Sequence, residues 1–272
     1  MRVLVTGAAG SIGRVVTLGL ADRGHEVVGL DLVPEPERFP GPWHTADCAD
    51  KDAVSAVFDT EHLDGVVHLA GYPGEADLPT ELTSHVITTA ALLDAMVTHR
   101  VPRIVYASSN HAVGRIPRSD LVSDDALPRP DTFYGIAKVA AEALLWLYVD
   151  RYALDGVACR IGSFRERPST ARELSTWLSH DDAVRMVEAS LTAPSPGYVV
   201  LYGISDNTRA WWDLEPGRRL GYEPQDNAER YAGQVAARPE DEADAAHVGG
   251  PFMRVDFHRP ALERGPEPAV GP

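Results

Sequence analysis

The chain opens on Val3-Leu4-Val5-Thr6-Gly7-Ala8-Ala9-Gly10-Ser11-Ile12-Gly13, an apolar run followed at once by three glycines in the spacing G-x-x-G-x-x-G. Residues 12–23 then have the apolar periodicity of a helix. A glycine loop between a strand and a helix allows a tight turn, a close backbone approach to a pyrophosphate, and an anion at the helix N-terminus. The stretch therefore predicts a dinucleotide site made by Gly7, Ala9, Gly10, Ser11, Ile12 and Gly13.

The alternation that begins there continues through the first two-thirds of the chain, where short β-branched runs alternate with longer amphipathic segments. This pattern is typical of α/β proteins with a doubly wound parallel sheet (the Rossmann architecture) and helices on both faces. Strands are expected at residues 2–6, 26–31, 43–47, 65–70, 103–108 and 156–161. Helices are expected at residues 12–23, 53–58, 83–98 and 133–152.

The last third of the chain does not continue the strand–helix alternation, because prolines interrupt shorter elements after Ser163. We expect a single nucleotide-binding domain over residues 1–262, with a small C-terminal substrate lobe built mainly from residues 164–262. Residues 263–272 are rich in proline and glycine without periodicity, which predicts a disordered tail.

Composition excludes several classes of protein. A net charge of −15 without a dense Lys/Arg stripe argues against a nucleic-acid partner. No apolar run approaches the roughly 20 residues that span a bilayer, and the N-terminus enters the glycine loop without a signal peptide. Cys48 and Cys159 stand far apart, which fits a reducing compartment, so we expect a cytoplasmic protein without a membrane partner. No metal site is expected, and the acidic run 239–244 is expected to be a solvated loop.

The acidic residue at the end of the second expected strand bears on the choice of cofactor. Asp31 can accept hydrogen bonds from the adenosine ribose hydroxyls and would repel a ribose phosphate. No Arg or Lys follows until Arg38, so NAD is favoured over NADP. Asp47 and Cys48 are candidates for the adenine edge, although Asp47 can equally be an ordinary loop cap. The small residues expected near the cofactor at the end of the fourth strand are Leu69, Ala70 and Gly71.

A tyrosine and a lysine open the longest helical pattern. The i, i+4 spacing of Tyr134 and Lys138 places a phenol and an ammonium on one helix face. A phenol is a poor base near neutral pH because its reference pKa is about 10, and a nearby cation lowers that pKa. Ser109 ends the fifth strand, at the edge where doubly wound sheets bind ligands. We predict Tyr134, Lys138 and Ser109 as the catalytic group, with Tyr134 and Lys138 also contacting the cofactor.

In this order, the glycine loop, acidic strand end, serine pair and Tyr/Lys pair resemble the extended branch of the short-chain dehydrogenase/reductase superfamily. Segments outside that shared core resemble uronate dehydrogenases over nearly the whole chain. These segments are Ala107-Ser108-Ser109-Asn110-His111 with Gly114, Arg160-Ile161-Gly162-Ser163, residues 172–182, Trp211-Trp212-Asp213, residues 221–229 and Gly249-Gly250-Pro251-Phe252.

The resemblance implies NAD-linked oxidation of cyclic D-galacturonate or D-glucuronate at C1, which gives an aldarolactone. It also implies that Arg172 clamps the substrate carboxylate, as a guanidinium can do bidentately, although a surface salt bridge is the alternative. His111 is a substrate contact or a structural histidine, and Phe252 covers the sugar ring or plugs the core. The implied substrate residues are Ser109, Asn110, His111, Tyr134, Ser163, Arg172 and Phe252.

Two positions depart from the family pattern. Pro73 stands where a substrate-contacting Ser is expected, and His85 stands where an Asn usually follows. These departures leave the hydroxyl selectivity and the proton path open. A nucleotide-sugar epimerase or dehydratase and a non-catalytic NAD-sensing regulator are the alternative functions. Related proteins often pair through helices beside the sheet, so a homo-oligomer is expected.

Overall fold

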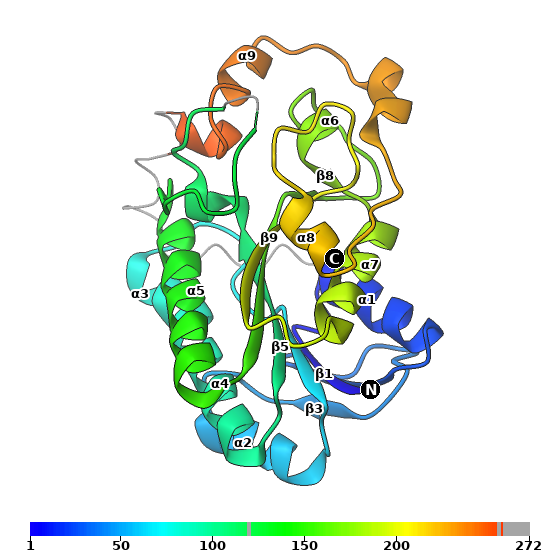
Figure 1. The fold of residues 1–272 in the computed structure, drawn as a ribbon, viewed down its shortest axis with the longest axis vertical. Helices are drawn as coiled ribbons and strands as arrows, with labels where there is room; N and C mark the ends of the chain where they lie inside the picture. Colours follow the sequence, from blue (N-terminus) through cyan, green and yellow to red (C-terminus); the bar gives the residue numbers. More distant parts are fainter. Residues whose placement is uncertain (119–120, 255–256, 258–272) are drawn as a thin grey trace.

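The computed structural model describes residues 1–118, 121–254 and 257. One sheet of seven parallel strands runs in the order β3-β2-β1-β4-β5-β6-β9 (Figure 1). The chain passes from one side of β1 to the other between β3 and β4, so the strand order reverses between β1 and β4. The predicted doubly wound sheet is confirmed. Its strands are β1 (Arg2–Thr6), β2 (Glu26–Asp31), β3 (Trp43–Thr45), β4 (Gly65–His68), β5 (Arg103–Ser109), β6 (Asp155–Ile161) and β9 (Tyr198–Gly203).

The strand at the far edge of the sheet was not placed by the sequence. Each of the six expected strands is present, with β3 and β4 ending earlier than expected. The additional strand β9 pairs with β6 in parallel, so that Gly156 faces Tyr198 and Ile161 faces Gly203. Residues beyond 163 therefore complete the main sheet as well as building the structure above it.

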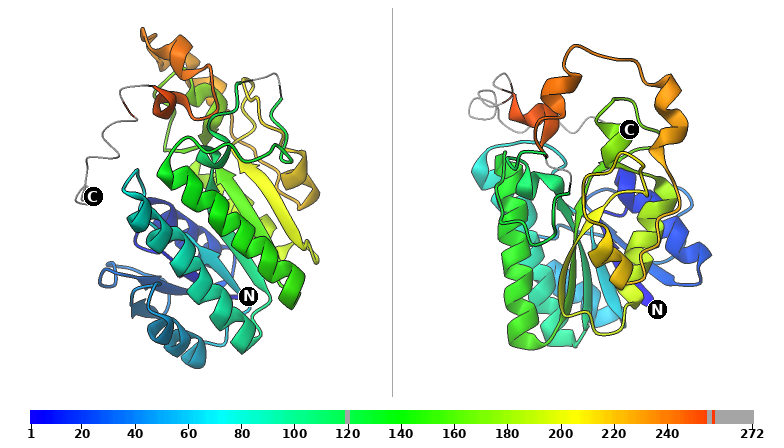
Figure 2. Two further views of the ribbon diagram at one scale, coloured as in Figure 1. Left: turned by 90° about the vertical axis from the view of Figure 1, so that its left-hand side faces the viewer. Right: turned by 45° about the horizontal axis from the view of Figure 1, so that its top comes forward.

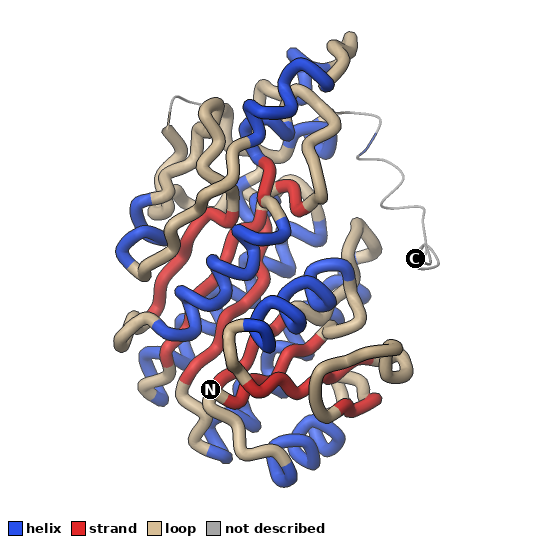
Figure 3. Tube along the Cα trace, turned by 90° about the vertical axis from the view of Figure 1, so that its right-hand side faces the viewer, coloured by secondary structure: helices blue, strands red, loops and turns tan. Residues whose placement is uncertain are grey.

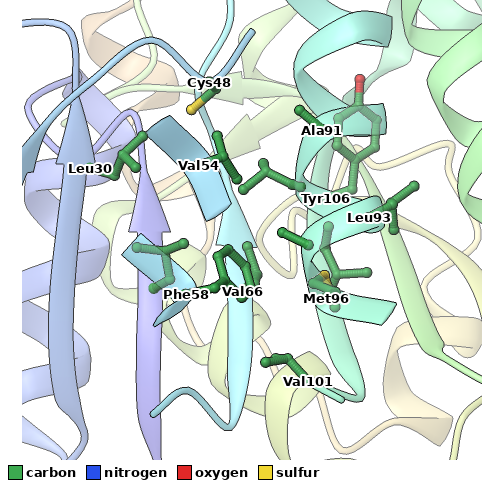
Figure 4. Close-up of a cluster of buried hydrophobic side chains, with 14 of the residues drawn as sticks. Leu30, Cys48, Val54, Phe58, Val66, Ala91, Leu93, Met96, Val101 and Tyr106 are labelled. Carbon is green, nitrogen blue, oxygen red and sulfur yellow. The ribbon is translucent and has the colours of Figure 1, made fainter. Parts of the chain in front are cut away.

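Helices cover both faces of the sheet (Figures 2 and 3). On one face lie α1 (Ser11–Asp22) and α7 (His180–Thr192). On the other lie α2 (Lys51–Thr60), α4 (Thr88–His99) and α5 (Phe133–Tyr152). The core on the second face includes Leu30, Val66 and Met96 (Figure 4). Because both faces are buried, the central strands carry consecutive apolar residues, such as Val3, Leu4 and Val5 in β1.

The helix expected at residues 83–98 is interrupted. The chain forms α3 (Leu78–Glu81), a π-helix η1 (Leu82–Ile87) and only then α4. The hydroxyls of Thr88 and Thr89 donate to the carbonyl oxygens of Ser84 and His85, four residues earlier. π-Turns are rare and are frequent at functional sites, and this one carries His85.

Most of the remaining elements lie beyond the carboxyl ends of the strands, at the top of Figure 1, whereas α8 (Glu215–Arg219) lies lower, beside β9. β7 (Ser163–Phe164) pairs with β8 (Trp177–Leu178), and α6 (Glu173–Thr176) connects them. The other elements are the 3-10 helices η2 (Asn110–Val113), η3 (Ala228–Gln234) and η4 (Gly250–Met253), with α9 (Asp241–Asp244). In the described ranges, no helix is long and apolar enough to cross a membrane.

Two predictions about the C-terminal third have different outcomes. The acidic run 239–244 is not simply a solvated loop, because α9 forms there and Asp244 is buried, accepting a hydrogen bond from Arg238 at 3.0 Å. The composition of the run does not show which of its acidic side chains is solvated and which pairs with an arginine. The tail predicted at residues 263–272 lies outside the described residues.

Candidate active site

The glycine loop is packed too closely for side chains. Gly7 has a φ of +66°, and a Cβ atom there would lie 2.7 Å from the backbone nitrogen of Ala70. A Cβ at Gly13 would overlap the carbonyl oxygen of Gly7. Gly10 caps α1, and its N–H donates to that same oxygen at 3.0 Å. The three glycines thus bring two strand ends and a helix start together, which is the cradle that a dinucleotide requires.

The surroundings of the loop also fit an anion and a ribose. The N-terminus of α1, at Ser11 and Ile12, has neither a side-chain cap nor an acidic residue in its first turn. Its first N–H groups therefore remain available to a phosphate. Asp31, at the end of β2, accepts from the N–H of Ala9 at 2.9 Å and so braces the loop. Each carboxylate oxygen has two lone pairs, so this contact leaves room for a ribose hydroxyl.

Other predicted cofactor residues lie around this cradle in different settings. Ala70 donates its N–H to Thr6, and Leu69 packs beside the core under α1. Asp47 accepts from the N–H of Ala49 at 2.8 Å, which is the loop-capping role. Cys48 is buried in the core under α2 and α4 (Figure 4), and burial raises the pKa of its thiol to about 12. The adenine contact of Asp47 and Cys48 stays a prediction.

The predicted catalytic residues come together at the carboxyl edge of the sheet. β5 ends at Ser109, and α5 begins at Phe133 with a cap in which Thr132 accepts from the N–H of Gly135 at 2.8 Å. The side chain of Ser109 hydrogen-bonds to Tyr134. The Nζ of Lys138 lies 5.2 Å from the centre of the Tyr134 ring and donates to the carbonyl of Ala107 at 2.6 Å. A serine hydroxyl, a phenol and an amine thus lie close together where β5 ends and α5 begins.

Burial dominates the acidity of this group. It raises the pKa of Tyr134 to about 12, although the hydrogen bond from Ser109 works to lower it. It lowers the pKa of Lys138 to about 7, although Glu81 and Glu142 work to raise it. The expected lowering of the phenol pKa is therefore not found in the protein alone. The ammonium of Lys138 can stabilise the phenolate only while it keeps its proton, so any charge that holds this proton bears on the acidity of the phenol.

Glu75, from the loop after β4, is a functional candidate that the sequence analysis missed. Its carboxylate accepts from the N–H groups of Phe133 at 2.9 Å and Tyr134 at 3.0 Å. These are two of the unpaired donors at the start of α5, and a negative charge there also favours the helix dipole. No local signal links a glutamate to a helix start nearly sixty residues later.

Two of the predicted substrate residues lie beside Tyr134. The ring of His111 lies 5.9 Å from that of Tyr134 and 4.3 Å from that of Phe252. The Nδ1 of His111 lies 2.9 Å from the buried carboxylate of Asp131, which orients the imidazole. Asp131 was also missed, because its position before Thr132 resembles an ordinary helix start.

Other predicted substrate residues meet at one carbonyl oxygen. Arg172 donates through Nη2 to the carbonyl of Val248 at 2.6 Å, and Asn110 donates to the same atom at 3.2 Å. The Nε of Arg172 is buried without a hydrogen-bond partner among the described residues. Burial lowers the pKa of Arg172 to about 10, so the guanidinium remains charged at neutral pH. Ser163 stands apart from this group, with its hydroxyl 2.9 Å from that of Thr176.

A cavity of about 510 Å³ also borders Arg172, on the lobe side. Arg118, Arg209 and Trp211 contribute to its wall, whereas Tyr134, Ser109 and His111 do not. Because the cavity does not reach the catalytic group, it does not locate the reacting carbon of a substrate.

Residues 3–165 match the family described as the NAD dependent epimerase/dehydratase family, and the chain belongs to it. NAD, the predicted cofactor, is confirmed at the level of that family. Uronate dehydrogenase of Pseudomonas putida is 36% identical over 264 residues, which cover 92% of this chain and 97% of the relative. Within the family, the chain therefore groups with the uronate dehydrogenases.

Solved structures agree with this grouping. The crystal structure of uronate dehydrogenase from Agrobacterium tumefaciens superposes with a TM-score of 0.86 at 38% identity, covering 93% of this chain and 96% of that one. In contrast, a UDP-glucose 4-epimerase of Corynebacterium glutamicum is 30% identical over 59% of this chain and only 50% of its own length. The similarity to the epimerase thus leaves half of that enzyme unmatched.

Proposed function

We propose that the protein oxidises the cyclic form of a hexuronic acid, D-galacturonate or D-glucuronate, at C1 with NAD and releases the aldarolactone. The observation that carries this proposal is the convergence of Ser109, Tyr134 and Lys138 at the edge of the sheet above the glycine loop. The full-length similarity to uronate dehydrogenases supports the choice of substrate.

NAD, when bound, accepts the hydride that leaves C1. Tyr134 acts as the base and takes the proton of the anomeric hydroxyl, while the hydroxyl of Ser109 hydrogen-bonds to the same oxygen. Lys138 in its ammonium form stabilises the phenolate. Because the base must be deprotonated and burial raises the pKa of Tyr134, kcat/KM is expected to rise with pH from the neutral into the alkaline range.

Arg172 supplies the charge that a uronate requires. Its Nη2 donates to the carbonyl of Val248, which fixes the guanidinium, and its Nε is a buried donor without a partner among the described residues, which a substrate carboxylate would satisfy. In a protein with a net charge of −15, such a cation offsets the repulsion of an anionic substrate. His111 and Phe252 would line the sugar ring on the side of Tyr134.

A substrate panel tests this function. D-galacturonate, D-glucuronate, D-galactose and UDP-galactose are each incubated with NAD or NADP, and the absorbance of the reduced cofactor is followed. Turnover of the uronates with NAD is expected. Epimerisation returns the hydride to the sugar and leaves the absorbance unchanged, so conversion of UDP-galactose to UDP-glucose is followed by chromatography. Epimerisation without uronate oxidation would favour the epimerase alternative, whereas NAD binding without turnover of any sugar would favour the regulator.

We also propose a homo-oligomer that pairs through α5. Large apolar side chains are exposed on its outer face and on the adjoining turn η1. Trp146 is 55% exposed and Tyr152 is 48% exposed, which is unusual for a free helix surface. Light scattering should give a dimer or larger assembly, and Trp146→Glu should shift it to the monomer. The proposed location is the cytoplasm, where the two buried free cysteines would stay reduced.

A further inference from the structure

Lys138 is a buried amine without an ion-pair partner in the described part of the chain. Its side chain donates to the carbonyl of Ala107 and lies 5.0 Å from the ring centre of Tyr106 and 5.2 Å from that of Tyr134. Neutral oxygens and aromatic rings compensate a buried ammonium only in part. A nearby buried carboxylate that is charged together with the amine would therefore decide how firmly Lys138 holds its proton.

Glu142 is near Lys138, but its charge is already engaged. Its two carboxylate oxygens accept from the guanidinium of Arg160 at 3.0 and 2.9 Å. One of the same oxygens also accepts from the hydroxyl of Ser108 at 2.5 Å. This buried pair is close to neutral as a unit, so it contributes little net field at Lys138.

Glu81, at the end of α3, is the carboxylate without such a partner. It is fully buried, and its Oε1 accepts from the N–H of Ala76 at 2.7 Å. Its Oε2 has no hydrogen-bond partner among the described residues and lies 3.3 Å from the Nε2 of His85. Burial raises the pKa of Glu81 to about 7, and the positive charge of Lys138 works against that rise.

His85 does not neutralise this carboxylate. Its Nε2 lies 3.1 Å from the carbonyl oxygen of Tyr72 and donates to it, which leaves Nδ1 without a proton. Burial, together with Lys138 and His68, lowers the pKa of His85 to about 2, so the imidazole is neutral. Its ring packs edge-to-face on that of Tyr134, with centres 5.1 Å apart.

We propose that Glu81 is the counter-charge of Lys138, keeping the amine protonated beside Tyr134, and that His85 is the uncharged spacer between the carboxylate and the phenol. Glu81 acts through Lys138, so it is a positioning residue. The proposal rests on the proposed role of Lys138 in the oxidation. The titratable groups that face this cluster are Tyr134, Lys138 and Glu142 on α5, Tyr106 on β5, His68 on β4, and Glu75 and Asp77 before α3.

The small number of lysines in the chain makes the protonation of Lys138 directly measurable. Lys51 and Lys138 are its two lysines, and Lys51 is a surface residue that pairs with Asp94. In Lys51→Arg protein labelled with ¹³C at lysine Cε, the remaining lysine signal reports the protonation of Lys138 by nuclear magnetic resonance. Adding Glu81→Gln should lower the titration midpoint of that signal by about one pH unit, as two charges several ångströms apart predict at an effective dielectric constant of about 20.

Asp77→Asn is the matched control, because it removes a partly exposed carboxylate from the same segment and should leave the midpoint in place. An unchanged midpoint in Glu81→Gln would overturn the proposal. If that variant does not fold, Glu81→Asp draws the carboxylate back by one methylene and should lower the midpoint by about 0.3 pH unit. An unchanged midpoint in Glu81→Asp would also overturn the proposal. Because the signal does not depend on turnover, failure of uronate oxidation would be recognised separately in the substrate panel.

Discussion

The glycine loop and the substrate lobe differ in how far apart along the chain their contacts lie. In the loop, Gly7, Gly10 and Gly13 contact one another within a single turn and a helix start. In the lobe, the carbonyl of Val248 binds Arg172 across 76 residues and Asn110 across 138. The predicted cofactor site therefore lies within one short motif, whereas the fold brings the predicted substrate contacts together from distant segments. Tyr134 stands where the two regions meet.

The largest effect is expected at this meeting point. Tyr134→Phe removes the phenolic oxygen, so kcat for uronate oxidation should fall about 10²- to 10⁴-fold, the usual contribution of a general base. The affinity for NAD, measured by calorimetry, should change little, because the glycine loop is untouched.

Tyr222→Phe makes the same chemical deletion at a distant buried site, where the hydroxyl donates to the carbonyl of Ile204. It should leave kcat close to that of the wild type. Equal losses in the two variants would mean that the effect on kcat is one of folding rather than of proton transfer.

The next largest effect should separate the cofactor region from the lobe. Gly13→Ala places a methyl group against the carbonyl oxygen of Gly7. Overpacking of this kind costs about 1–3 kcal/mol, so the affinity for NAD should fall roughly 10- to 100-fold. Titration with NAD measures it, and Gly233→Ala is the control because a Cβ there meets no atom within 4 Å. An unchanged affinity in Gly13→Ala would contradict the close packing of the loop.

Most of the fold and the cofactor cradle could be predicted because their signals are local. The spacing of the three glycines, the apolar strands and the exact bounds of α5 follow from periodicity and turn chemistry within short windows. The proximity of Ser109, Tyr134 and Lys138 could also be predicted, since Ser109 ends a strand and Tyr134 and Lys138 share a helix face; their catalytic roles stay a prediction. The pKa values of Tyr134 and Lys138 could not be predicted from the sequence. Both are set mainly by burial, which is a property of the packed core.

The residues that were missed depend on long-range or irregular backbone. Glu75 caps a helix far along the chain, and Asp131 meets His111 only because α5 starts beside η2. The π-turn η1 was not foreseen because an inserted residue per turn hardly alters an apolar pattern. His85 could be flagged as a departure from the family, but its neutral state follows from burial and from the positive charge of Lys138, which only the folded structure brings together.

A substitution of Arg172 tests the predicted substrate contacts in the lobe. Arg172→Ala removes charge-assisted hydrogen bonds worth about 1.5–3 kcal/mol, so KM for D-galacturonate should rise roughly 10- to 100-fold. KM for NAD should stay constant, and any activity on neutral D-galactose should be unaffected. Arg209→Ala, on the wall of the same cavity, is the matched control. Similar losses on galactose and galacturonate would rule out carboxylate recognition by Arg172.

The smallest effect is expected at Glu75, which links the loop after β4 to the start of α5. Glu75→Gln keeps one acceptor for the N–H of Phe133 or Tyr134 but removes the charge at the helix start. Loss of a helix cap costs about 1 kcal/mol, so Tm should fall by about 2–4 °C. Glu75→Ala, which removes both acceptors, should fall further, while Glu35→Gln on the exposed surface serves as the control. If Glu75→Gln instead lowered kcat about as much as Tyr134→Phe with an unchanged Tm, Glu75 would belong to the proton path rather than to the support of α5.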